Sequence, residues 1–359
     1  MIILPIDENW NHTADFLRQT AITLSKDNKV VIYDQKNAYF FLKKATKINY
    51  PKYKNIYFHR VKYFLPLRRL DFLEKINRQL SFWLFIQKNS KVNKILWIFY
   101  PNYFDLAQIK NKKMLNLYDC VDYNQFRDKE ELLIKNVDYF FVNSLVLQGL
   151  HKKALKQPIY IDSQGFFIPD EKKIENTYLK IKKPIVGYVG GINYRLDFSL
   201  LDRLIKNNPQ WQFVFYGPKQ KYPKEDLQFQ TEFWIKKLKN YKNVIFGESK
   251  NRYHVYGVIK NFDVAIIPYN EDIAFNKYCY PMKVFEYLYF GKPIVSTEIK
   301  ELKTKVFIKT AKNVKEFEKL IKKLLISNKS LNYKRNKKIA IQNSWQNKIE
   351  KMSKIIVDS

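Results

Sequence analysis

Two charged side chains in the second half of the chain have the type and spacing to bind an anionic ligand. Lys283 and Glu286 belong to the segment YPMKVFEYLYFGKPIVST, which covers residues 280–297. Its apolar residues recur at helical spacing, and Gly291 and Pro293 then end the helix before a short apolar strand. Lys283 and Glu286 would therefore lie near a helix N-terminus, where backbone N–H groups favour an anion such as a diphosphate.

An ordinary connection between helix and strand, with an exposed ion pair one turn apart, is the alternative. However, the segment resembles the donor-binding signature of GT-B glycosyltransferases, in particular glycosyltransferase family 4 and its bacterial relatives in capsule and cell-wall polysaccharide synthesis. The resemblance implies that Glu286 binds the ribose hydroxyls of a nucleotide sugar. The family pattern has another Glu eight residues upstream, where this sequence has Tyr278. The resemblance therefore implies neither a retaining nor an inverting outcome.

A pair of glycines and an arginine follow the predicted first strand of the C-terminal half. The sequence PIVGYVGGINYR begins at residue 184 and indicates a buried strand that ends in Gly190 and Gly191, with Arg195 soon after. Glycines let a backbone approach a ligand closely, although Gly-Gly alone usually marks only a turn. In GT-B enzymes the matching loop approaches the donor diphosphate. The resemblance thus implies that Arg195 and Lys283 bind the diphosphate.

Asp119 and Asp122 are the candidate catalytic residues. They follow an apolar run at residues 114–118, and open α/β sheets carry their sites at such strand ends. A carboxylate there can take the proton of an attacking sugar hydroxyl, and the stretch resembles the acceptor domain of the same glycosyltransferases. A turn with an Asp helix cap is the alternative, and Asp122 is favoured over Asp119. His12 and His59 are further acid/base candidates, with an ordinary loop role favoured for His12.

Short apolar runs that end at turns predict the strands of a doubly wound α/β protein. We expect them at residues 2–4, 30–33, 95–100, 114–118, 184–189, 211–216, 244–246 and 264–268, with a further strand at the end of VDYFFVNS, residues 137–144. A helix is expected at about residues 14–25. Gly247 and Glu248, after the strand at 244–246, resemble the family's loop at the nucleotide base.

The chain divides into two predicted domains, because 359 residues and a hydrophobic fraction of 46% suit two cores. We predict an N-terminal acceptor-binding domain at residues 1–168, a linker at 169–183 and a C-terminal nucleotide-sugar-binding domain at 184–335. Residues 336–359 include NSWQNKIEKM, which resembles the closing helix that crosses back to the N-terminal domain. The resemblance implies a GT-B fold, with two Rossmann-like domains facing a cleft.

A formal net charge of +31 favours anionic partners. Most of the excess is Lys and no nucleic-acid-binding motif is visible, so an anionic membrane surface is favoured and no nucleic acid is expected. An AT-rich coding sequence is the alternative origin of this composition. Residues 62–91 mix cations such as Arg68 and Arg69 with aromatics such as Trp83. That mixture suits a helix at a lipid interface, with an ordinary core helix equally favoured.

Cys120 and Cys279 are the two cysteines and have no metal-like spacing, which fits a reducing compartment. The chain shows neither a membrane-spanning apolar run nor a basic signal-peptide start. We therefore expect a cytoplasmic protein, peripheral on the inner face of the cytoplasmic membrane. No cofactor and no metal are expected, since the sequence lacks the Asp-x-Asp pair by which many GT-A transferases bind a divalent ion.

These features predict a metal-independent glycosyltransferase. It would move a sugar from a nucleotide-sugar donor, with a UDP-sugar expected, to a saccharide or lipid-linked acceptor in surface polysaccharide biosynthesis. Two other classes stay open on the sequence. A GT-B-type nucleotide-sugar epimerase would use a similar donor site, and a non-catalytic polyanion-binding or nucleic-acid-binding protein would rest on charge alone.

Overall fold

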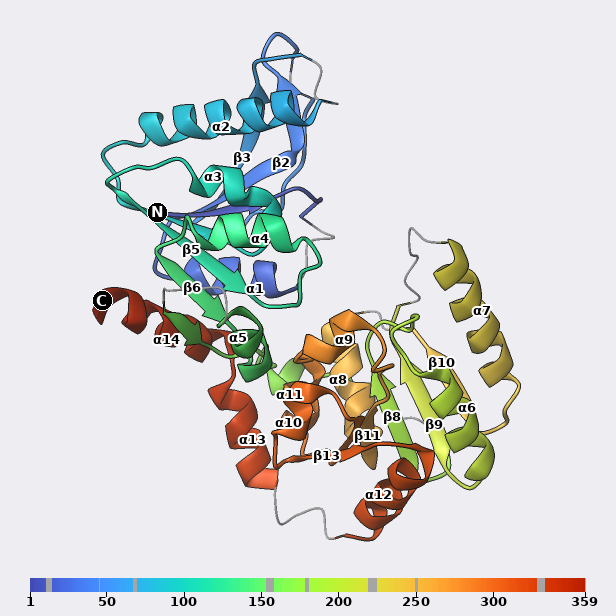
Figure 1. Cartoon of the computed structure of the whole chain (residues 1–359). Helices are drawn as coiled ribbons and strands as arrows, with labels where there is room; N and C mark the ends of the chain where they lie inside the picture. The colour runs from blue at the N-terminus through green and yellow to red at the C-terminus, as the bar shows by residue number, and fades with distance from the viewer. Residues whose placement is uncertain are drawn as a thin grey trace. The chain divides into compact units, whose positions relative to one another are not determined.

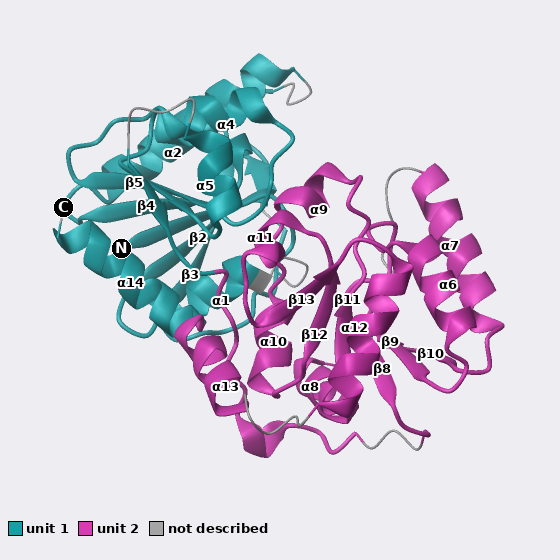
Figure 2. Cartoon of the chain, turned by 60° about the horizontal axis from the view of Figure 1, so that its bottom comes forward, with its two compact units in different colours: residues 1–163, 345–359 teal, residues 164–344 magenta. Residues whose placement is uncertain are grey.

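The computed structural model describes residues 1–10, 15–44, 46–66, 70–152, 158–177, 181–218, 225–248, 251–327 and 333–358. The chain forms two compact units, which Figure 1 shows by position in the chain and Figure 2 colours separately. Unit 1 comprises residues 1–163 and 345–359, and unit 2 comprises residues 164–344. The last helix therefore belongs to the unit that the N-terminus begins.

Unit 1 is built on a seven-stranded sheet in the order β3-β2-β1-β4-β5-β6-β7, and its recorded strand pairs are parallel. The strands are β1 (Ile2–Ile6), β2 (Val30–Phe40), β3 (Ile56–Tyr63), β4 (Lys94–Ile98), β5 (Met114–Cys120), β6 (Tyr139–Val142) and β7 (Ile159–Ile161). Since β2 and β4 both pair with β1, the strand order reverses beside β1, where ligands bind in open parallel sheets.

Helical segments connect most of these parallel strands, whereas the described residues between β2 and β3 form no helix. The helices are α1 (Asp15–Leu24), α2 (Asp71–Lys88), α3 (Phe104–Ala107), α4 (Arg127–Ile134), α5 (Leu145–His151) and the returning α14 (Trp345–Asp358), with a 3₁₀ turn at Pro101–Tyr103. Ile349 and Met352 of α14 join the core that contains Leu17 of α1 and Leu4 of β1. The returning helix is therefore a structural part of unit 1.

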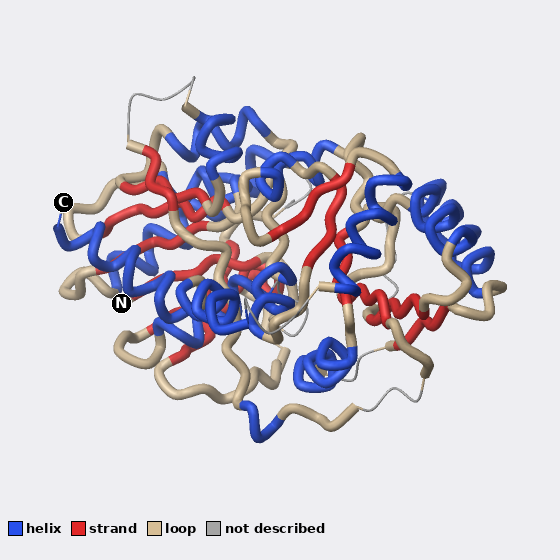
Figure 3. Tube along the Cα trace, turned by 90° about the horizontal axis from the view of Figure 1, so that it is seen from below, coloured by secondary structure: helices blue, strands red, loops and turns tan. Residues whose placement is uncertain are grey.

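Unit 2 has a second parallel sheet, in the order β10-β9-β8-β11-β12-β13. Figure 3 shows the strands of each unit with helices packed along them. The strands are β8 (Ile185–Val189), β9 (Gln212–Tyr216), β10 (Val244–Gly247), β11 (Val264–Ile267), β12 (Ile294–Thr297) and β13 (Ile308–Ala311). The helices are α6 (Phe198–Asn207), α7 (Glu225–Lys239), α8 (Arg252–Asn261), α9 (Ala274–Tyr278), α10 (Lys283–Tyr289), α11 (Lys300–Lys303), α12 (Val314–Ile326) and α13 (Tyr333–Gln342), with a 3₁₀ turn at Glu171–Lys173.

The predicted strands are all present, and the signature segment forms α10, a turn and β12. The turn requires Gly291, which has φ 65° in the left-handed region. β3, β7 and β13 were not predicted. The segment 62–91 is not one helix, because its first two residues end β3 and α2 begins only at Asp71.

The predicted domain boundaries need correction. Residue 168 does not end the first domain, since Phe166 packs in the core of unit 2 and the Phe167 carbonyl accepts from the Tyr256 hydroxyl. The expected linker at 169–183 also belongs to unit 2, where the Glu171 carboxylate accepts from Tyr289 at 2.8 Å. At the other end, α13 packs on α10, so only the residues from Trp345 onward return to unit 1.

Candidate active site

The side chain of Lys283, at the start of α10, lies against the turn that follows β8. Its Nζ donates to the hydroxyls of Tyr188 at 2.7 Å and Tyr269 at 2.9 Å. Gly190 has φ 129°, and a Cβ there would lie 2.6 Å from this Nζ. A side chain at Gly190 would therefore fill the space that the ammonium occupies. A cation held against a half-buried glycine turn is an arrangement that can bind a phosphate.

Burial lowers the pKa of Lys283, and the neighbouring Tyr269 opposes this effect. Burial alone would raise the pKa of Tyr269, but the positive charges of Lys283 and Arg195 outweigh it and lower the pKa. The pair thus shares a hydrogen bond in a site that carries net positive charge. Such a site favours a bound anion.

Arg195 contacts both the Tyr269 ring and residues of α9. Its Nε donates to Asn276 Oδ1 at 2.8 Å, and its guanidinium carbon is 4.8 Å from the Tyr269 ring centroid and 4.2 Å from that of Phe275. The Asn276 amide donates in turn to the Arg195 carbonyl at 2.9 Å. The structure therefore brings the predicted pair, Arg195 and Lys283, to one aromatic ring.

Glycines join the ends of β8, β9 and β10. The Gly190 N–H donates to the Tyr216 carbonyl at 2.9 Å, and the Gly217 N–H donates to the Gly247 carbonyl at 3.0 Å. A Cβ at Gly217 would lie 2.0 Å from the Gly190 carbonyl oxygen, and one at Gly247 would lie 2.0 Å from the Tyr216 ring. Gly247 thus has a packing role whether or not it contacts a nucleotide.

The other predicted donor-site residues flank this group. Glu286 lies in the first turn of α10 with 9% of its surface exposed. The Gly191 carbonyl accepts from the Tyr188 hydroxyl at 3.0 Å, so its backbone helps to fix the turn. Glu248 is exposed and directly follows β10. The sequence analysis missed Tyr188, Tyr269 and Asn276, although all three position its predicted cations.

The catalytic assignment of Asp119 needs correction. Its side chain is fully buried in unit 1, where Oδ1 accepts from Lys348 of α14 at 3.0 Å and Oδ2 accepts from Trp97 at 3.3 Å. A general base must reach the proton of its substrate. Both oxygens of Asp119 are occupied inside the unit, so we assign it to the docking of α14.

Asp122 lies in the turn after β5 and is partly exposed. Its backbone carbonyl accepts from the Cys120 thiol at 3.4 Å. Burial raises the pKa of Tyr100, after β4, and the negative charges of Glu8, Asp7 and Asp122 raise it further. Carboxylates from the ends of β1 and β5 therefore lie near Tyr100. The sequence analysis did not predict Asp7 and Glu8 as site residues. The catalytic role of Asp122 stays a prediction.

The two histidine candidates do not strengthen the site. His12 lies outside the described residues. His59 packs in β3 between aromatic rings, 5.5 Å from Tyr33 and 4.5 Å from Phe85 by centroid, and burial lowers its pKa to about 4. His59 is therefore a half-buried residue that packs among aromatic rings, and its low pKa favours the neutral imidazole.

Comparison with known proteins finds a family that matches the part of the chain in which these residues lie. Residues 170–341 match the family model described as Glycosyl transferases group 1. Unit 2 is therefore similar to glycosyl transferases group 1 domains. The matched region contains each residue predicted for the donor site: Gly190, Gly191, Arg195, Gly247, Glu248, Lys283 and Glu286.

One curated relative is TuaH of Bacillus subtilis (strain 168), which is named as a teichuronic acid biosynthesis glycosyltransferase. It is 25% identical over 229 residues, which cover 57% of this chain and 55% of that protein. The match thus spans about half the length of this curated relative.

Among solved structures, sucrose-phosphate synthase from Thermosynechococcus elongatus has a TM-score of 0.74 at 13% identity and covers 99% of this chain and 98% of its own. Alr3699/HepE of Anabaena, in complex with UDP-glucose, has a TM-score of 0.68 at 13% identity and covers 100% of both chains. The predicted GT-B fold, with two Rossmann-like α/β domains, is confirmed by these similarities.

Proposed function

We propose that this protein is a glycosyltransferase of surface polysaccharide biosynthesis that takes its sugar from a nucleotide sugar. The observation that carries the proposal is the Lys283 ammonium against the Gly190 turn, with Arg195 beside the same Tyr269 ring. The group lies in the domain that matches the glycosyl transferases group 1 family. This match favours transfer over the epimerase and the non-catalytic binding protein.

In the proposed reaction Lys283 and Arg195 bind the donor diphosphate. Negative charge on this leaving group grows as the bond to the sugar breaks, so fixed cations stabilise the transition state more than the ground state. The contacts of Lys283 with two tyrosines and of Arg195 with Asn276 hold both cations in place beforehand. Glu286 binds ribose, and Asp122 accepts the proton of the acceptor hydroxyl.

A UDP-sugar is the donor that the relatives favour. The Anabaena HepE structures contain UDP, UDP with glucose, or UDP-glucose, and a Staphylococcus aureus TarM structure contains UDP. The TuaH name refers to teichuronic acid, a surface polysaccharide. These similarities support a UDP-sugar donor and a saccharide acceptor for this chain, and a lipid-linked saccharide is part of the proposal.

An anionic membrane surface is the proposed location of the acceptor. None of the described helices is long and apolar enough to cross a bilayer. However, α2 exposes Phe72, Ile76 and Trp83, which follow one another at helical spacing, with 60%, 44% and 47% of their surface accessible. Such a face on a strongly basic, cytoplasmic protein suits peripheral binding to an anionic leaflet. Arg68 and Arg69, which the sequence assigned to this surface, lie outside the described residues.

Titration calorimetry with UDP tests the donor site. We expect one site in the wild-type protein and a loss of about 1.5 to 3 kcal/mol for Glu286→Ala, because a charge-assisted hydrogen bond to ribose is removed. Glu232→Ala, on an exposed part of α7, is the matched control and should bind UDP like the wild type. Unchanged affinity in a folded Glu286→Ala protein would remove Glu286 from the site.

A further inference from the structure

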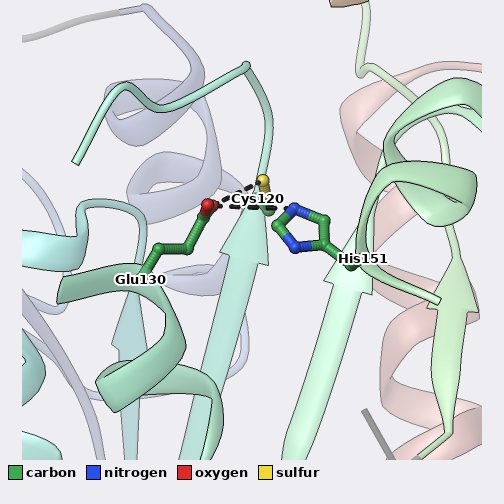
Figure 4. A group of neighbouring side chains, drawn as sticks. All are labelled: Cys120, Glu130 and His151. Carbon is green, nitrogen blue, oxygen red and sulfur yellow. Dashed lines mark hydrogen bonds and ion pairs between the residues drawn. The ribbon is translucent and has the colours of Figure 1, made fainter. Parts of the chain in front are cut away.

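A buried group of three side chains in unit 1 has the chemistry of a metal site (Figure 4). Cys120 ends β5, Glu130 lies in α4 and His151 is the last residue of α5. Their exposed fractions are 1%, 1% and 2%. Cysteine sulfur, carboxylate oxygen and imidazole nitrogen are the three ligand types that Zn²⁺ accepts in proteins.

The distances between the three ligand atoms suit one small ion. Cys120 Sγ is 3.6 Å from Glu130 Oε1, and His151 Nε2 is 3.7 Å from the same oxygen. All three atoms lie within 4.8 Å of one another. Tetrahedral bonds of about 2.0 to 2.3 Å to zinc place neighbouring ligand atoms roughly 3.3 to 3.7 Å apart. The side chains would therefore need only small shifts to share an ion.

His151 supplies an independent observation. Its Nε2 is buried and has no hydrogen-bond partner among the described residues. The Glu130 oxygen is too distant to accept a hydrogen bond from it. An unsatisfied buried nitrogen costs about 1 to 3 kcal/mol of folding free energy, and a metal ion bound to Nε2 would satisfy this nitrogen. The Phe140 ring packs edge-on against the imidazole, 5.1 Å between centroids, and fixes its direction.

Glu130 also has the outer contacts that orient a metal-binding carboxylate. Its Oε1 accepts from the Tyr118 hydroxyl at 2.6 Å, and its Oε2 accepts from Arg127 at 2.7 Å. Hydrogen bonds of this kind commonly fix the ligands of protein metal sites. In addition, one thiolate and one carboxylate balance the charge of a divalent ion, which suits a site without solvent.

We propose that Cys120, Glu130 and His151 bind a structural Zn²⁺ ion. Thiolate and imidazole ligands favour zinc over Mg²⁺ and Ca²⁺, which prefer oxygen. The fourth position would be taken by water or a backbone carbonyl. The ion would connect α4 and α5 to the end of β5, two residues before Asp122, and so order the turn that carries the proposed acceptor carboxylate.

A hydrogen-bonded group without metal is the competing interpretation. In it the Cys120 thiol donates to Glu130 and to the Asp122 carbonyl. That interpretation accounts for the cysteine and the glutamate but leaves His151 Nε2 without a partner. The two interpretations predict different metal contents for the same folded protein.

Metal analysis of the full chain, purified without a polyhistidine tag, separates them. After dialysis against Zn²⁺ and removal of free ion, the wild type should retain about one zinc per chain. Cys120→Ala and His151→Phe should retain less than about a tenth. Cys279→Ala removes the other cysteine, which is buried in unit 2, and should retain zinc like the wild type. EDTA should lower the melting temperature of the wild type and of Cys279→Ala.

Replacement of zinc by Co²⁺ in the wild type decides the matter even if the variants fail to fold. A tetrahedral cobalt spectrum with a thiolate-to-cobalt charge-transfer band is expected. A wild type that retains no zinc and takes up no cobalt overturns the proposal. So does metal binding without the thiolate band, or equal zinc in folded Cys120→Ala. None of these readouts uses a sugar donor, so they are independent of the proposed function.

Discussion

Lys283 illustrates how much a single side chain depends on its neighbours. Burial alone makes a charged ammonium costly, and it lowers the pKa of this lysine. Two tyrosine hydroxyls accept hydrogen bonds from its ammonium, and the centroid of the Tyr188 ring lies 3.9 Å from Nζ as a cation–π partner. These contacts replace part of the lost hydration and fix the ammonium beside Gly190. A bound diphosphate would add the missing negative charge.

Asp122 is the residue on which the acceptor proposal depends. Asp122→Asn keeps the size of the side chain but removes its basicity, and loss of general-base assistance typically lowers a rate about 10²- to 10⁴-fold. We expect transfer to fall by that factor while UDP affinity, which belongs to unit 2, stays unchanged. Initial rates with a labelled donor and calorimetry with UDP measure the two quantities.

Asp119→Asn is the comparison variant for this prediction. Because Asp119 is buried against Lys348, its replacement should lower the stability of unit 1 rather than act on the chemical step. If folded Asp119→Asn loses transfer while Asp122→Asn does not, the two aspartates have been assigned in the wrong order. Normal transfer by both proteins would place the base elsewhere.

The sequence predicted Lys283 and Arg195 from local patterns, but not the side chains around them. Tyr188 lies in the strand before the glycine turn and Tyr269 follows β11, so only the parallel pairing of β8 with β11 brings them together. Asp119 and Asp122 look equivalent in the sequence. Lys348 and Trp97, whose side chains contact Asp119, come from distant parts of the chain, and no local pattern reveals them.

At the scale of elements, α14 is docked on unit 1 by one buried lysine between two carboxylates. Lys348 Nζ lies 3.0 Å from Asp119 Oδ1 at the end of β5 and 3.3 Å from Asp162 Oδ2 after β7. Burial lowers the pKa of Lys348, but the two carboxylates outweigh it and raise the pKa. The chain thus returns from unit 2 to a specific charged position in unit 1.

Lys348→Met tests this docking. It leaves two buried carboxylates without their cation, and removal of one partner of a buried pair typically costs about 3 to 5 kcal/mol. Urea unfolding of the variant should show a loss of that size. Lys354→Met changes an exposed lysine of the same helix and should change stability by less than about 0.5 kcal/mol. Equal, small effects of both variants would contradict a docking role for Lys348.

Asp162 adds a pH dependence to the same contact. Burial raises its pKa from 3.8 to about 6, although Lys348 opposes the rise. The folded protein therefore holds this proton more tightly than the unfolded chain, so Asp162 reduces stability as pH rises from about 4 through about 6. Such a pKa difference corresponds to about 3 kcal/mol.

Asp162→Asn should remove this dependence. Its stability relative to the wild type is expected to increase between about pH 4 and pH 7, by up to about 3 kcal/mol. Denaturant unfolding of both proteins across this range measures the difference, and the other titrating groups cancel. A difference that is constant with pH, or that falls as pH rises, would contradict the pKa assignment.

Continuous apolar runs made most strands predictable, because both faces of a parallel strand are buried. Ile185–Val189 and Val264–Ile267 are examples in which each residue is buried. β3 escaped prediction because Ile56–Tyr63 alternates with exposed and charged residues at the edge of its sheet. The boundary near residue 168 was misplaced because Phe166 and Phe167 give no local sign of the core that they join.

At the scale of the whole molecule, the net charge of +31 and the exposed face of α2 predict salt-sensitive membrane binding. The wild type should co-sediment with vesicles that contain anionic lipid, and binding should weaken as salt rises, because attraction is screened within about 8 Å at physiological ionic strength. Replacing Phe72, Ile76 and Trp83 with Ser should weaken binding at least about tenfold, since each side chain loses apolar area in the interface.

Phe229→Ser with Phe233→Ser is the matched control, because these two side chains are exposed on α7 of unit 2. It should bind vesicles like the wild type. Equal binding to neutral vesicles, no binding to either kind, or an equal loss in the control would show that the α2 face is not the membrane surface.

The central claim concerns the whole protein: that it transfers sugar from a nucleotide sugar bound by unit 2. The most direct measurement is the release of free nucleotide from a panel of UDP-, GDP-, ADP- and CMP-sugars. The wild type is compared with Lys283→Met and with a control, Lys206→Met, which changes an exposed lysine of α6. We predict transfer or slow hydrolysis of a UDP-sugar by the wild type and the Lys206 control, with at least about a tenfold loss in Lys283→Met. Turnover of no donor, epimerised sugar without release of nucleotide, or full activity in Lys283→Met would contradict the account.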